Sequence, residues 1–335
     1  MRTIYFLLLA LLLPFTATHA TPLPQLRISV ENSPSHVQTR AVKRFADTLA
    51  ERTEGRLDIR FHDQAALYRD KDVLYALAQG KVEMAVPGTW HVMKFEPNIG
   101  IFLLPCFYGR PARDTYDILN GPVGTALNNR VEKATQARVI GSWIDLGHAH
   151  LYGVTRKITA HEDISGLRIR VAGGAANEMR ITALGGTPFS IAWPDLPIKL
   201  EQKVVDGILT THETVRSAKL WEHGIRYAFE DREYFPQYIP LIRNSFWNRL
   251  PDDLKKIITR TWEEHVDQAR AEAAEAQLSA RDVLLSHGVE IVTPSPAAVT
   301  TWREHIFPAQ PKMVQALRID PELLKQTMSE LPSTH

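Results

Sequence analysis

The sequence predicts an α/β protein built from two successive sets of strand–helix units and braced by one long helix. Three observations support this. Short apolar strands alternate with helical segments from residue 25 to about residue 210. The alternation restarts near residues 145–150, which indicates a change of sheet. Finally, no proline or glycine falls between Pro251 and Gly288, so this stretch predicts a helix of more than thirty residues, longer than either half needs.

The first twenty residues have the layout of a secretory signal peptide. They contain one charge at Arg2, an apolar run over residues 4–13 and a small-residue end at Ala20. Ten apolar residues are too few to span a bilayer, and no later stretch approaches eighteen. We therefore expect cleavage near Ala20 and a mature chain exported to the periplasm.

The composition of the mature chain limits its class. About 315 residues remain, enough for two domains of ordinary size. Acidic and basic residues are equal in number after Arg2 is removed, so bulk charge attracts neither nucleic acid nor an anionic membrane. The one cysteine, Cys106, lies among apolar residues, which predicts a buried structural thiol and no internal disulfide.

The first set of units follows from periodicity. Alternation predicts strands at residues 25–32, 57–62 and 82–88. Helical spacing from Val37 to Leu49, with Gly55 as a stop, predicts a helix between the first two strands. We expect the remaining elements of this half in the following order: a helix over 70–80, one or two helices over 111–135, and strands at 137–147 and 148–157.

The second set begins with the segment GLRIRVAGG. We expect strands at 166–174, 187–193 and 207–213, with helices at 176–186 and 195–207 between them. The aromatic-rich stretch 234–247 is extended and returns to the first sheet. The tail, 296–330, is predicted to be helical, with breaks at Pro308, Pro311 and Pro321.

Arg170 is the first candidate for ligand binding. It lies at the carboxyl end of a predicted strand, where open α/β sheets bind ligands. Gly173 and Gly174 then let a ligand approach the backbone, and the following helix start favours an anion. An arginine holds a carboxylate with two parallel hydrogen bonds, although an interdomain salt bridge is an equal alternative. We expect Arg168, earlier in the strand, to pair with an acid or reach solvent.

Around these residues the chain resembles the solute-binding subunits of tripartite ATP-independent periplasmic (TRAP) transporters, the DctP-like family. The carrying segment is DISGLRIRVAGGAANEMRITALGGTPFSIAWPDLPIKLEQKVVDG. It is similar to the family's strand "GLK-hydrophobic-RVP", its helix ending "LGATP" and its helix closing in "VDG". The similarity extends over nearly the whole mature chain, from the first strand to SFWNRLPDDLKKII.

The resemblance implies a two-lobe periplasmic binding protein fold of the Venus-flytrap type with a long bridging helix. Lobe I is expected at 21–147 plus 236–275 and lobe II at 148–235, with C-terminal helices from 276–335 across both. It also implies a protein that is not an enzyme and has no cofactor. Arg170 would bind the carboxylate of a small organic acid, which lobe closure captures for the small and large membrane subunits of the transporter.

Two departures from the family pattern bear on the ligand. Many members carry an arginine where this chain has His150, and an asparagine where it has Thr210. Histidine is only partly charged near neutral pH, and threonine offers one hydroxyl in place of an amide. We expect both residues to complete a softened clamp around Arg170, which favours a monocarboxylate over a dicarboxylate or sialic acid.

Other candidates follow from their place at strand ends. Trp193 matches a position where the family often has an aromatic residue against the ligand, and a core tryptophan is the alternative. We expect further side chains from lobe I and lobe II to face the cleft, and a solvated position is the alternative for Glu31. These side chains are Glu31, Thr89, Trp90 and Glu213. Tyr234 and Phe235 of the crossing segment would line the hinge side or belong to the core.

Two rival functions remain open at the level of sequence. His148 and His150 share a strand face and could hold zinc in an enzyme, but no HExxH motif supplies the usual spacing. No GxSxG, P-loop or GxGxxG motif occurs either. A periplasmic binding protein that serves a membrane sensor would have the same sequence features as one that serves transport.

Overall fold

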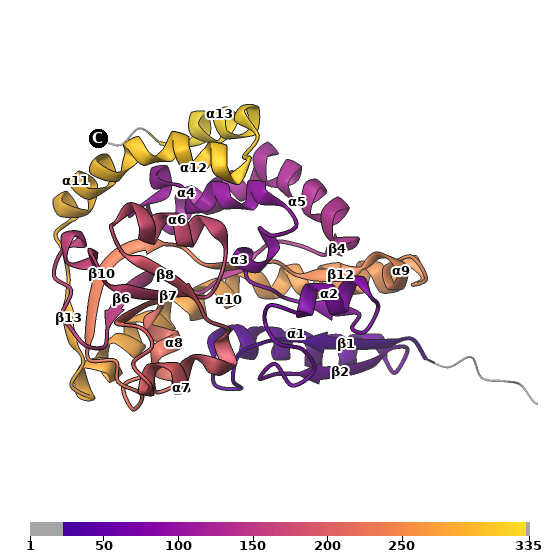
Figure 1. Ribbon diagram of the computed structural model, residues 1–335. Coiled ribbons are helices and arrows are strands. Elements are labelled where there is room, and N and C mark those ends of the chain that lie inside the picture. Colours follow the sequence, from indigo (N-terminus) through magenta and orange to yellow (C-terminus); the bar gives the residue numbers. More distant parts are fainter. Residues whose placement is uncertain (1–22, 333–335) are drawn as a thin grey trace, which may run out of the picture.

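Two β-sheets, each covered by its own helices, form two lobes that lie side by side (Figure 1). The computed structural model describes residues 23–332. The expected signal peptide, residues 1–20, lies outside the described residues. The α/β two-lobe architecture predicted from the sequence is confirmed.

The first lobe contains a five-stranded sheet in the order β2-β1-β3-β12-β4. Its elements are β1 (Gln25–Ser29), α1 (Val37–Thr53), β2 (Asp58–His62), α2 (Val73–Ala78), β3 (Met84–Ala85), α3 (Thr89–Val92), α4 (Ala112–Asn120), α5 (Pro122–Thr135), β4 (Ala137–Val139), β12 (Leu241–Arg243) and α9 (Asn244–Trp247). Strand β1 runs parallel to β2 and β3, as βαβ units require. Strand β12 enters antiparallel between β3 and β4, so the return of the crossing segment to the first sheet is confirmed.

The second lobe contains a six-stranded sheet in the order β13-β10-β6-β9-β7-β8. Its elements are β6 (Ala149–Gly153), β7 (Arg168–Val171), α6 (Ala175–Ala183), β8 (Thr187–Ser190), α7 (Leu196–Glu201), β9 (Gly207–Thr210), α8 (His212–Ser217), β10 (Tyr227–Tyr234) and β13 (Glu290–Val292). Strand β7, which carries Arg170, is parallel to both β8 and β9. Its Ile169 and Val171 are fully buried, which fixes the strand in the core.

A short two-stranded ribbon connects the lobes. It pairs β5 (Ile144–Asp145) antiparallel with β11 (Gln237–Tyr238). The expected single strand over 137–147 is wrong, because β4 and β5 belong to different sheets. Gly141 lies between them against the long helix, where an added Cβ would come within 2.6 Å of Trp262 Cδ1. The chain therefore turns at this close contact instead of continuing one ladder.

The long helix α10 (Asp252–Ser286) braces both lobes, as predicted. Asp252 and Asp253 occupy its first turn, where carboxylates favour the helix dipole. Toward lobe I, Glu272 pairs with Arg44 of α1 at 2.9 Å. Toward lobe II, the Gln277 side chain accepts a hydrogen bond of 3.1 Å from the backbone N–H of Glu213 in α8.

The C-terminal segment crosses the top of the molecule as three helices (Figure 1). These are α11 (Pro296–Ile306), α12 (Gln310–Leu317) and α13 (Pro321–Glu330). Each has a proline in its first turn, where the missing N–H costs least. Helix α12 contacts α6 of the second lobe and α13 contacts α5 of the first.

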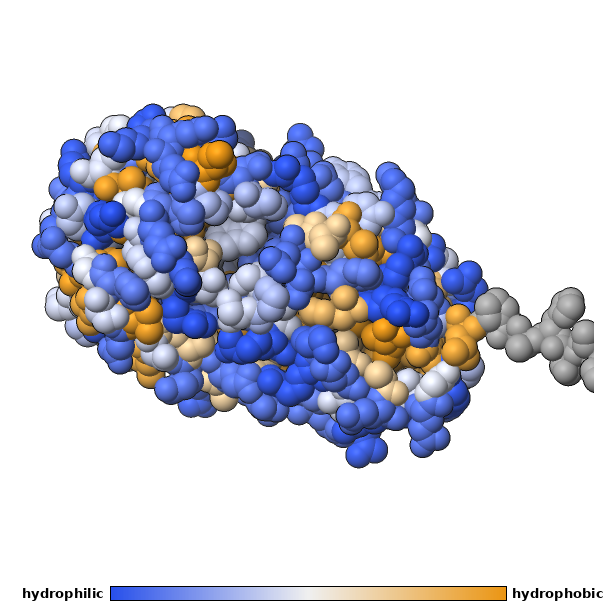
Figure 2. All heavy atoms as spheres, turned by 90° about the horizontal axis from the view of Figure 1, so that it is seen from below, coloured by the Kyte–Doolittle hydropathy of each residue, from blue (hydrophilic) through white to orange (hydrophobic). Residues whose placement is uncertain are grey.

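The face of the molecule in Figure 2 is mostly hydrophilic, and the cysteine lies inside the protein. In the face shown in Figure 2, hydrophilic residues predominate and apolar residues form separate patches. Within residues 23–332, no helix has the length and apolar character needed to cross a bilayer. Cys106 is free and buried as predicted, and burial raises the pKa of its thiol to about 12.

Candidate ligand-binding site

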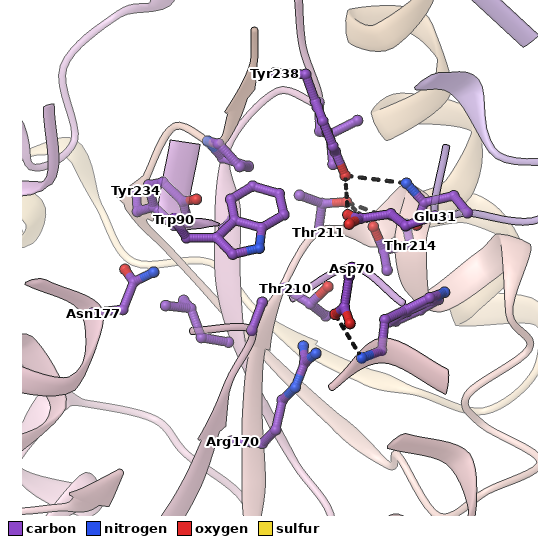
Figure 3. A pocket seen from close by; sticks show the side chains of 17 residues that line it. Glu31, Asp70, Trp90, Arg170, Asn177, Thr210, Thr211, Thr214, Tyr234 and Tyr238 are labelled. Atoms are coloured by element: carbon purple, nitrogen blue, oxygen red, sulfur yellow. Dashed lines mark hydrogen bonds between the residues drawn. The ribbon is translucent and has the colours of Figure 1, made fainter. Parts of the chain in front are cut away.

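A cavity of about 50 Å³ lies between the lobes at the carboxyl ends of the strands (Figure 3). Lobe I contributes Glu31, Asn32, Asp70 and Trp90. Lobe II contributes Ala149, Arg170, Ala172, Asn177, Trp193, Leu209, Thr210, Thr211, Thr214 and Tyr234, and the segments between the lobes add Leu146, Pro236 and Tyr238. A ligand in this cavity therefore touches both lobes and the ribbon that connects them.

Arg170 enters the cavity from β7. It is 2 % exposed, and its Nε and Nη2 both donate to the carbonyl oxygen of Ile191, at 3.0 and 2.9 Å. Among the described residues, no acceptor lies within hydrogen-bond distance of Nη1. The carbonyl thus fixes the plane of the guanidinium, and one edge is left to bind a ligand. By contrast, Arg168 pairs with Asp206 at 2.8 Å, as expected.

Two carboxyl groups line the same cavity. Glu31 accepts a 3.0 Å hydrogen bond from the Tyr238 hydroxyl. Asp70 accepts a 2.9 Å hydrogen bond from the backbone N–H of Trp193, across the lobe interface. His91 of α3 lies behind them, with Nε2 at 3.8 Å from Glu31 Oε2 and 3.7 Å from Asp70 Oδ2.

Burial sets the ionisation of this group. It raises the pKa of Glu31 to about 8, with the charge of Asp70 as the second cause. Burial also lowers the pKa of His91 to about 4, so its imidazole is neutral near pH 7. The pKa of Arg170 is lowered by burial to about 10, and Asp70 and Glu31 oppose this shift. Near neutral pH, Arg170 is therefore charged while Glu31 is mostly protonated.

The structure brings together five of the eight side chains predicted to bind the ligand. Arg170, Thr210, Trp193, Glu31 and Trp90 all line the cavity. His150, Thr89 and Glu213 do not.

His150 faces away from the cavity because strand neighbours alternate sides. Ala149 occupies the cavity-facing position of β6, and His150 lies beside a separate cavity near α10. There its ring centroid is 4.7 Å from that of His212, and its Nδ1 accepts a hydrogen bond from the backbone N–H of Arg232. Burial holds the pKa of His150 well below its usual value, so it adds no charge to a clamp. The expected partnership of His150 with Arg170 is therefore wrong.

Thr89 and Glu213 were also expected to face the cleft, but neither lines the cavity. Thr89 is buried at the first position of α3 and only its neighbour Trp90 reaches the cavity. Glu213 is fully buried at the start of α8, where Arg216 Nε donates to it at 2.7 Å. This internal partner occupies the carboxylate that was expected to bind a polar group of the ligand.

The glycine pair after β7 serves the lobe interface. Gly173 and Gly174 have φ angles of +130° and +86°, which favour glycine. A Cβ on Gly174 would lie 3.1 Å from the backbone oxygen of Trp90. The close approach expected for a ligand is therefore made by Trp90 of lobe I.

Several cavity residues carried no clear signal in the sequence. Asp70 is the first residue of the helix predicted over 70–80, a position that does not indicate a cavity. Tyr238 lies in the aromatic-rich crossing segment, whose Tyr234 was considered and whose Phe235 lines the other cavity. Thr211 and Thr214 follow β9 directly, so the end of that strand was the signal that could have located them.

His148 and His150, on which the zinc alternative is based, belong to no cluster of three potential metal ligands among the described residues. In residues 23–332, one group of three His, Cys, Asp or Glu side chains brings its ligand atoms within 4.8 Å, namely Glu31, Asp70 and His91. His148 instead bonds the carbonyl oxygen of Arg110 at 2.9 Å. Both histidines thus have hydrogen-bond partners within the protein.

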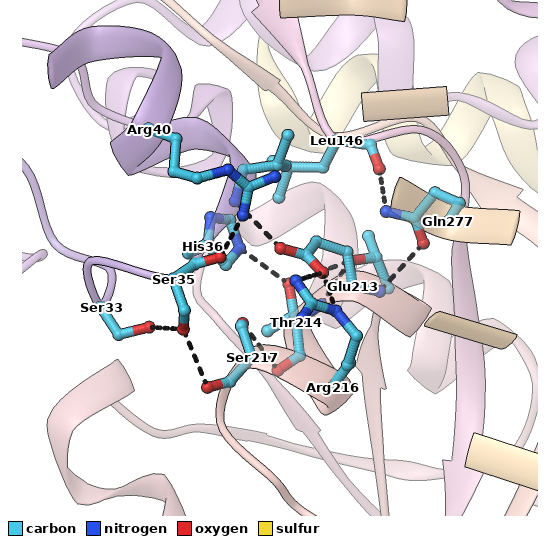
Figure 4. Close-up of polar contacts among 12 residues, drawn as sticks. Ser33, Ser35, His36, Arg40, Leu146, Glu213, Thr214, Arg216, Ser217 and Gln277 are labelled. Atoms are coloured by element: carbon cyan, nitrogen blue, oxygen red, sulfur yellow. Dashed lines mark hydrogen bonds and ion pairs between the residues drawn. The ribbon is translucent and has the colours of Figure 1, made fainter. Parts of the chain in front are cut away.

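Direct contacts hold the two lobes closed around the cavity (Figure 4). Glu213 accepts a 3.0 Å hydrogen bond from the backbone N–H of Val37, at the start of α1. His36 Nε2 lies 3.2 Å from Thr214 Oγ1. On the other side of the cavity Arg69 forms an ion pair with Asp195. These contacts exist only when the lobes meet.

We expect Glu213→Ala to shift the protein toward an open form. The substitution removes the acceptor for Val37 N–H, and a hydrogen bond to a charged group contributes about 1.5–3 kcal/mol. Small-angle X-ray scattering of the ligand-free protein should therefore give a larger radius of gyration than the wild type. Glu201→Gln, which alters an exposed acid of α7, is the control. Identical scattering of Glu213→Ala and wild type would contradict this role.

Two α/β lobes closed over a buried arginine define an extracytoplasmic solute-binding protein. Residues 28–316 match the family described as Bacterial extracellular solute-binding protein, family 7, and the chain belongs to this DctP family. It is a binding protein of a transport family and not an enzyme.

Known relatives are similar along most of their length. The C4-dicarboxylate-binding periplasmic protein DctP of Rhodobacter capsulatus is 24% identical over 293 residues, which cover 85% of each chain. A TRAP solute-binding protein of Desulfovibrio salexigens with bound orotic acid superposes with a TM-score of 0.84 at 22% identity, over 92% of this chain and 98% of that one. The galactonate complex of a sugar acid binding protein from Advenella mimigardefordensis gives 0.85 at 20% identity, with the same coverage.

Proposed function

We propose that this protein captures a small monocarboxylate in the periplasm and delivers it to the membrane subunits of a TRAP transporter. The observation that carries the proposal is Arg170, a buried guanidinium with one free edge toward a cavity between the lobes. Among the described residues that line the cavity, it is the single lysine or arginine. One such cation matches one carboxylate.

The same arrangement supports capture by lobe closure. Ligand groups that touch Glu31 and Trp90 on lobe I and Arg170 on lobe II can do so together only when the lobes are closed. A ligand with higher affinity for the closed form shifts the population toward it. Related proteins with bound orotic acid, galactonate and succinate support a carboxylate as the shared feature.

A thermal-shift screen of residues 21–335 against organic acids, amino acids and sugar acids tests this proposal. A ligand that binds only the folded protein at 100 times its Kd stabilises it by about 2.7 kcal/mol, so the melting temperature should rise by several degrees. We expect the responding compounds to be carboxylates. A response limited to uncharged compounds or to inorganic anions would contradict the proposed function.

A further inference from the structure

The cavity is lined by two acidic side chains but by only one basic side chain among the described residues. Glu31 and Asp70 both line it, and no lysine or arginine of residues 23–332 forms an ion pair with either. Their hydrogen bonds come from neutral groups, namely the Tyr238 hydroxyl and the backbone N–H groups of Lys71 and Trp193. A carboxylate ligand on Arg170 adds a further negative charge. Buried carboxylates are costly in their ionised form unless a cation is near, so a positive group of the ligand would stabilise ionised Glu31 and Asp70.

The acids are placed to receive such a charge. Figure 3 shows Arg170 entering the cavity from one side and Glu31 from the opposite side, with Asp70 between them. Glu31 Oε1 accepts a hydrogen bond from Tyr238, whereas Oε2 accepts none from residues 23–332 and lies 3.8 Å from His91 Nε2. An extended ligand can therefore place a carboxylate on Arg170 and a donor group beside the two acids.

Aromatic rings surround the same end of the cavity. The ring of Trp90 packs against Tyr238 at 5.2 Å between centroids and against Tyr234 at 6.5 Å, both edge to face. Such rings attract a cation through their electron-rich faces. The remaining wall includes the apolar side chains of Leu146, Leu209 and Pro236. It also includes side chains that form hydrogen bonds, namely Asn32, Asn177, Thr210, Thr211 and Thr214.

We propose that the ligand is a small zwitterion, whose carboxylate binds Arg170 and whose ammonium group binds between Glu31 and Asp70 against the aromatic rings. This inference rests on the proposed function and narrows it from monocarboxylates to those that carry a cationic nitrogen.

The test compares ligands that differ only in the cationic group. Four matched pairs of increasing length are titrated calorimetrically into refolded, ligand-free protein. The pairs are glycine and glycolate, β-alanine and 3-hydroxypropanoate, 4-aminobutanoate and 4-hydroxybutanoate, and L-proline and tetrahydrofuran-2-carboxylate. Succinate, glucuronate, CaCl₂ and ZnCl₂ complete the set. The variants are Glu31→Gln and Asp70→Asn, and Glu201→Gln, which alters an exposed acid of α7, is the control.

We expect at least one amino compound to bind wild type ten or more times more tightly than its oxygen partner. Glu31→Gln should bring this ratio close to one, Asp70→Asn should reduce it, and Glu201→Gln should leave it unchanged. Equal or tighter binding of the oxygen partners, of succinate or of glucuronate overturns the inference while the proposed carboxylate function stands. Stabilisation by Ca²⁺ or Zn²⁺ that is lost in Glu31→Gln also overturns it. If no carboxylate in the set binds, both the inference and the proposed function are contradicted.

Discussion

Arg170→Ala is expected to lose ligand binding while the fold is retained. Arg170 is the one lysine or arginine among the described cavity residues. Removal of its guanidinium leaves a bound carboxylate facing Glu31 and Asp70. Truncating one partner of a buried charge pair costs about 2–5 kcal/mol, so affinity should fall by roughly 30-fold or more. Calorimetric titration with the tightest carboxylate of the screen measures this loss.

The same strand offers a matched control. Arg168 lies two residues earlier, pairs with Asp206 and is partly exposed. Arg168→Ala removes an arginine of the same strand and should leave affinity unchanged. The fold of Arg170→Ala should persist because its side-chain hydrogen bonds go to one carbonyl, that of Ile191. Circular dichroism checks the fold, and Arg170→Gln serves if the alanine variant unfolds. Unchanged affinity in a folded Arg170 variant would contradict the assigned site.

Local patterns predicted most of the fold. Periodicity located α1 and the strands β7 and β9, because their buried faces repeat at the spacing of a helix or a strand. The absence of proline and glycine located α10. The break between β4 and β5 could not be predicted in this way, since it depends on the packing of Gly141 against a helix more than one hundred residues later.

The candidate site was predictable where strand position alone decides it. Arg170 and Thr210 end strands and line the cavity, as their positions indicate. His150 was misplaced because the side on which a strand residue points depends on register, and Ala149 has the inward position. Glu213 was misassigned because Arg216 and the Val37 N–H occupy its carboxylate, a contact between lobes that spacing does not reveal.

One residue of the ribbon that connects the lobes also lines the cavity. Tyr238 belongs to the ribbon strand β11, and its hydroxyl contacts both Glu31 and Asn32 of lobe I. A ligand that changes the charge of Glu31 therefore acts on a side chain fixed to the connection between the lobes. This links ionisation at the cavity to the ribbon that connects the lobes.

Binding of a zwitterion is expected to strengthen as pH rises from 6 to 8. The pKa of Glu31 is about 8 in the empty cavity, so below that value its carboxyl is mostly protonated. An ammonium group binds the ionised form, and each pH unit below 8 then weakens binding by about tenfold. Three other groups that face Glu31 do not titrate in this range. They are His91 with a pKa of about 4, Arg170 with a pKa of about 10, and Tyr238, whose pKa burial raises well above its usual value.

For a carboxylate ligand without a cationic group, we expect the affinity to change with pH in the opposite direction. Its charge would be repelled by ionised Glu31, so its affinity should fall as pH rises through 8 and stay level below it. Calorimetry at pH 7 in phosphate and in Tris separates the cases, because the two buffers differ in ionisation enthalpy. A zwitterion should release close to one proton per ligand in wild type and none in Glu31→Gln. Proton uptake on binding, or release that persists in Glu31→Gln, would show that Glu31 does not bind the cationic group.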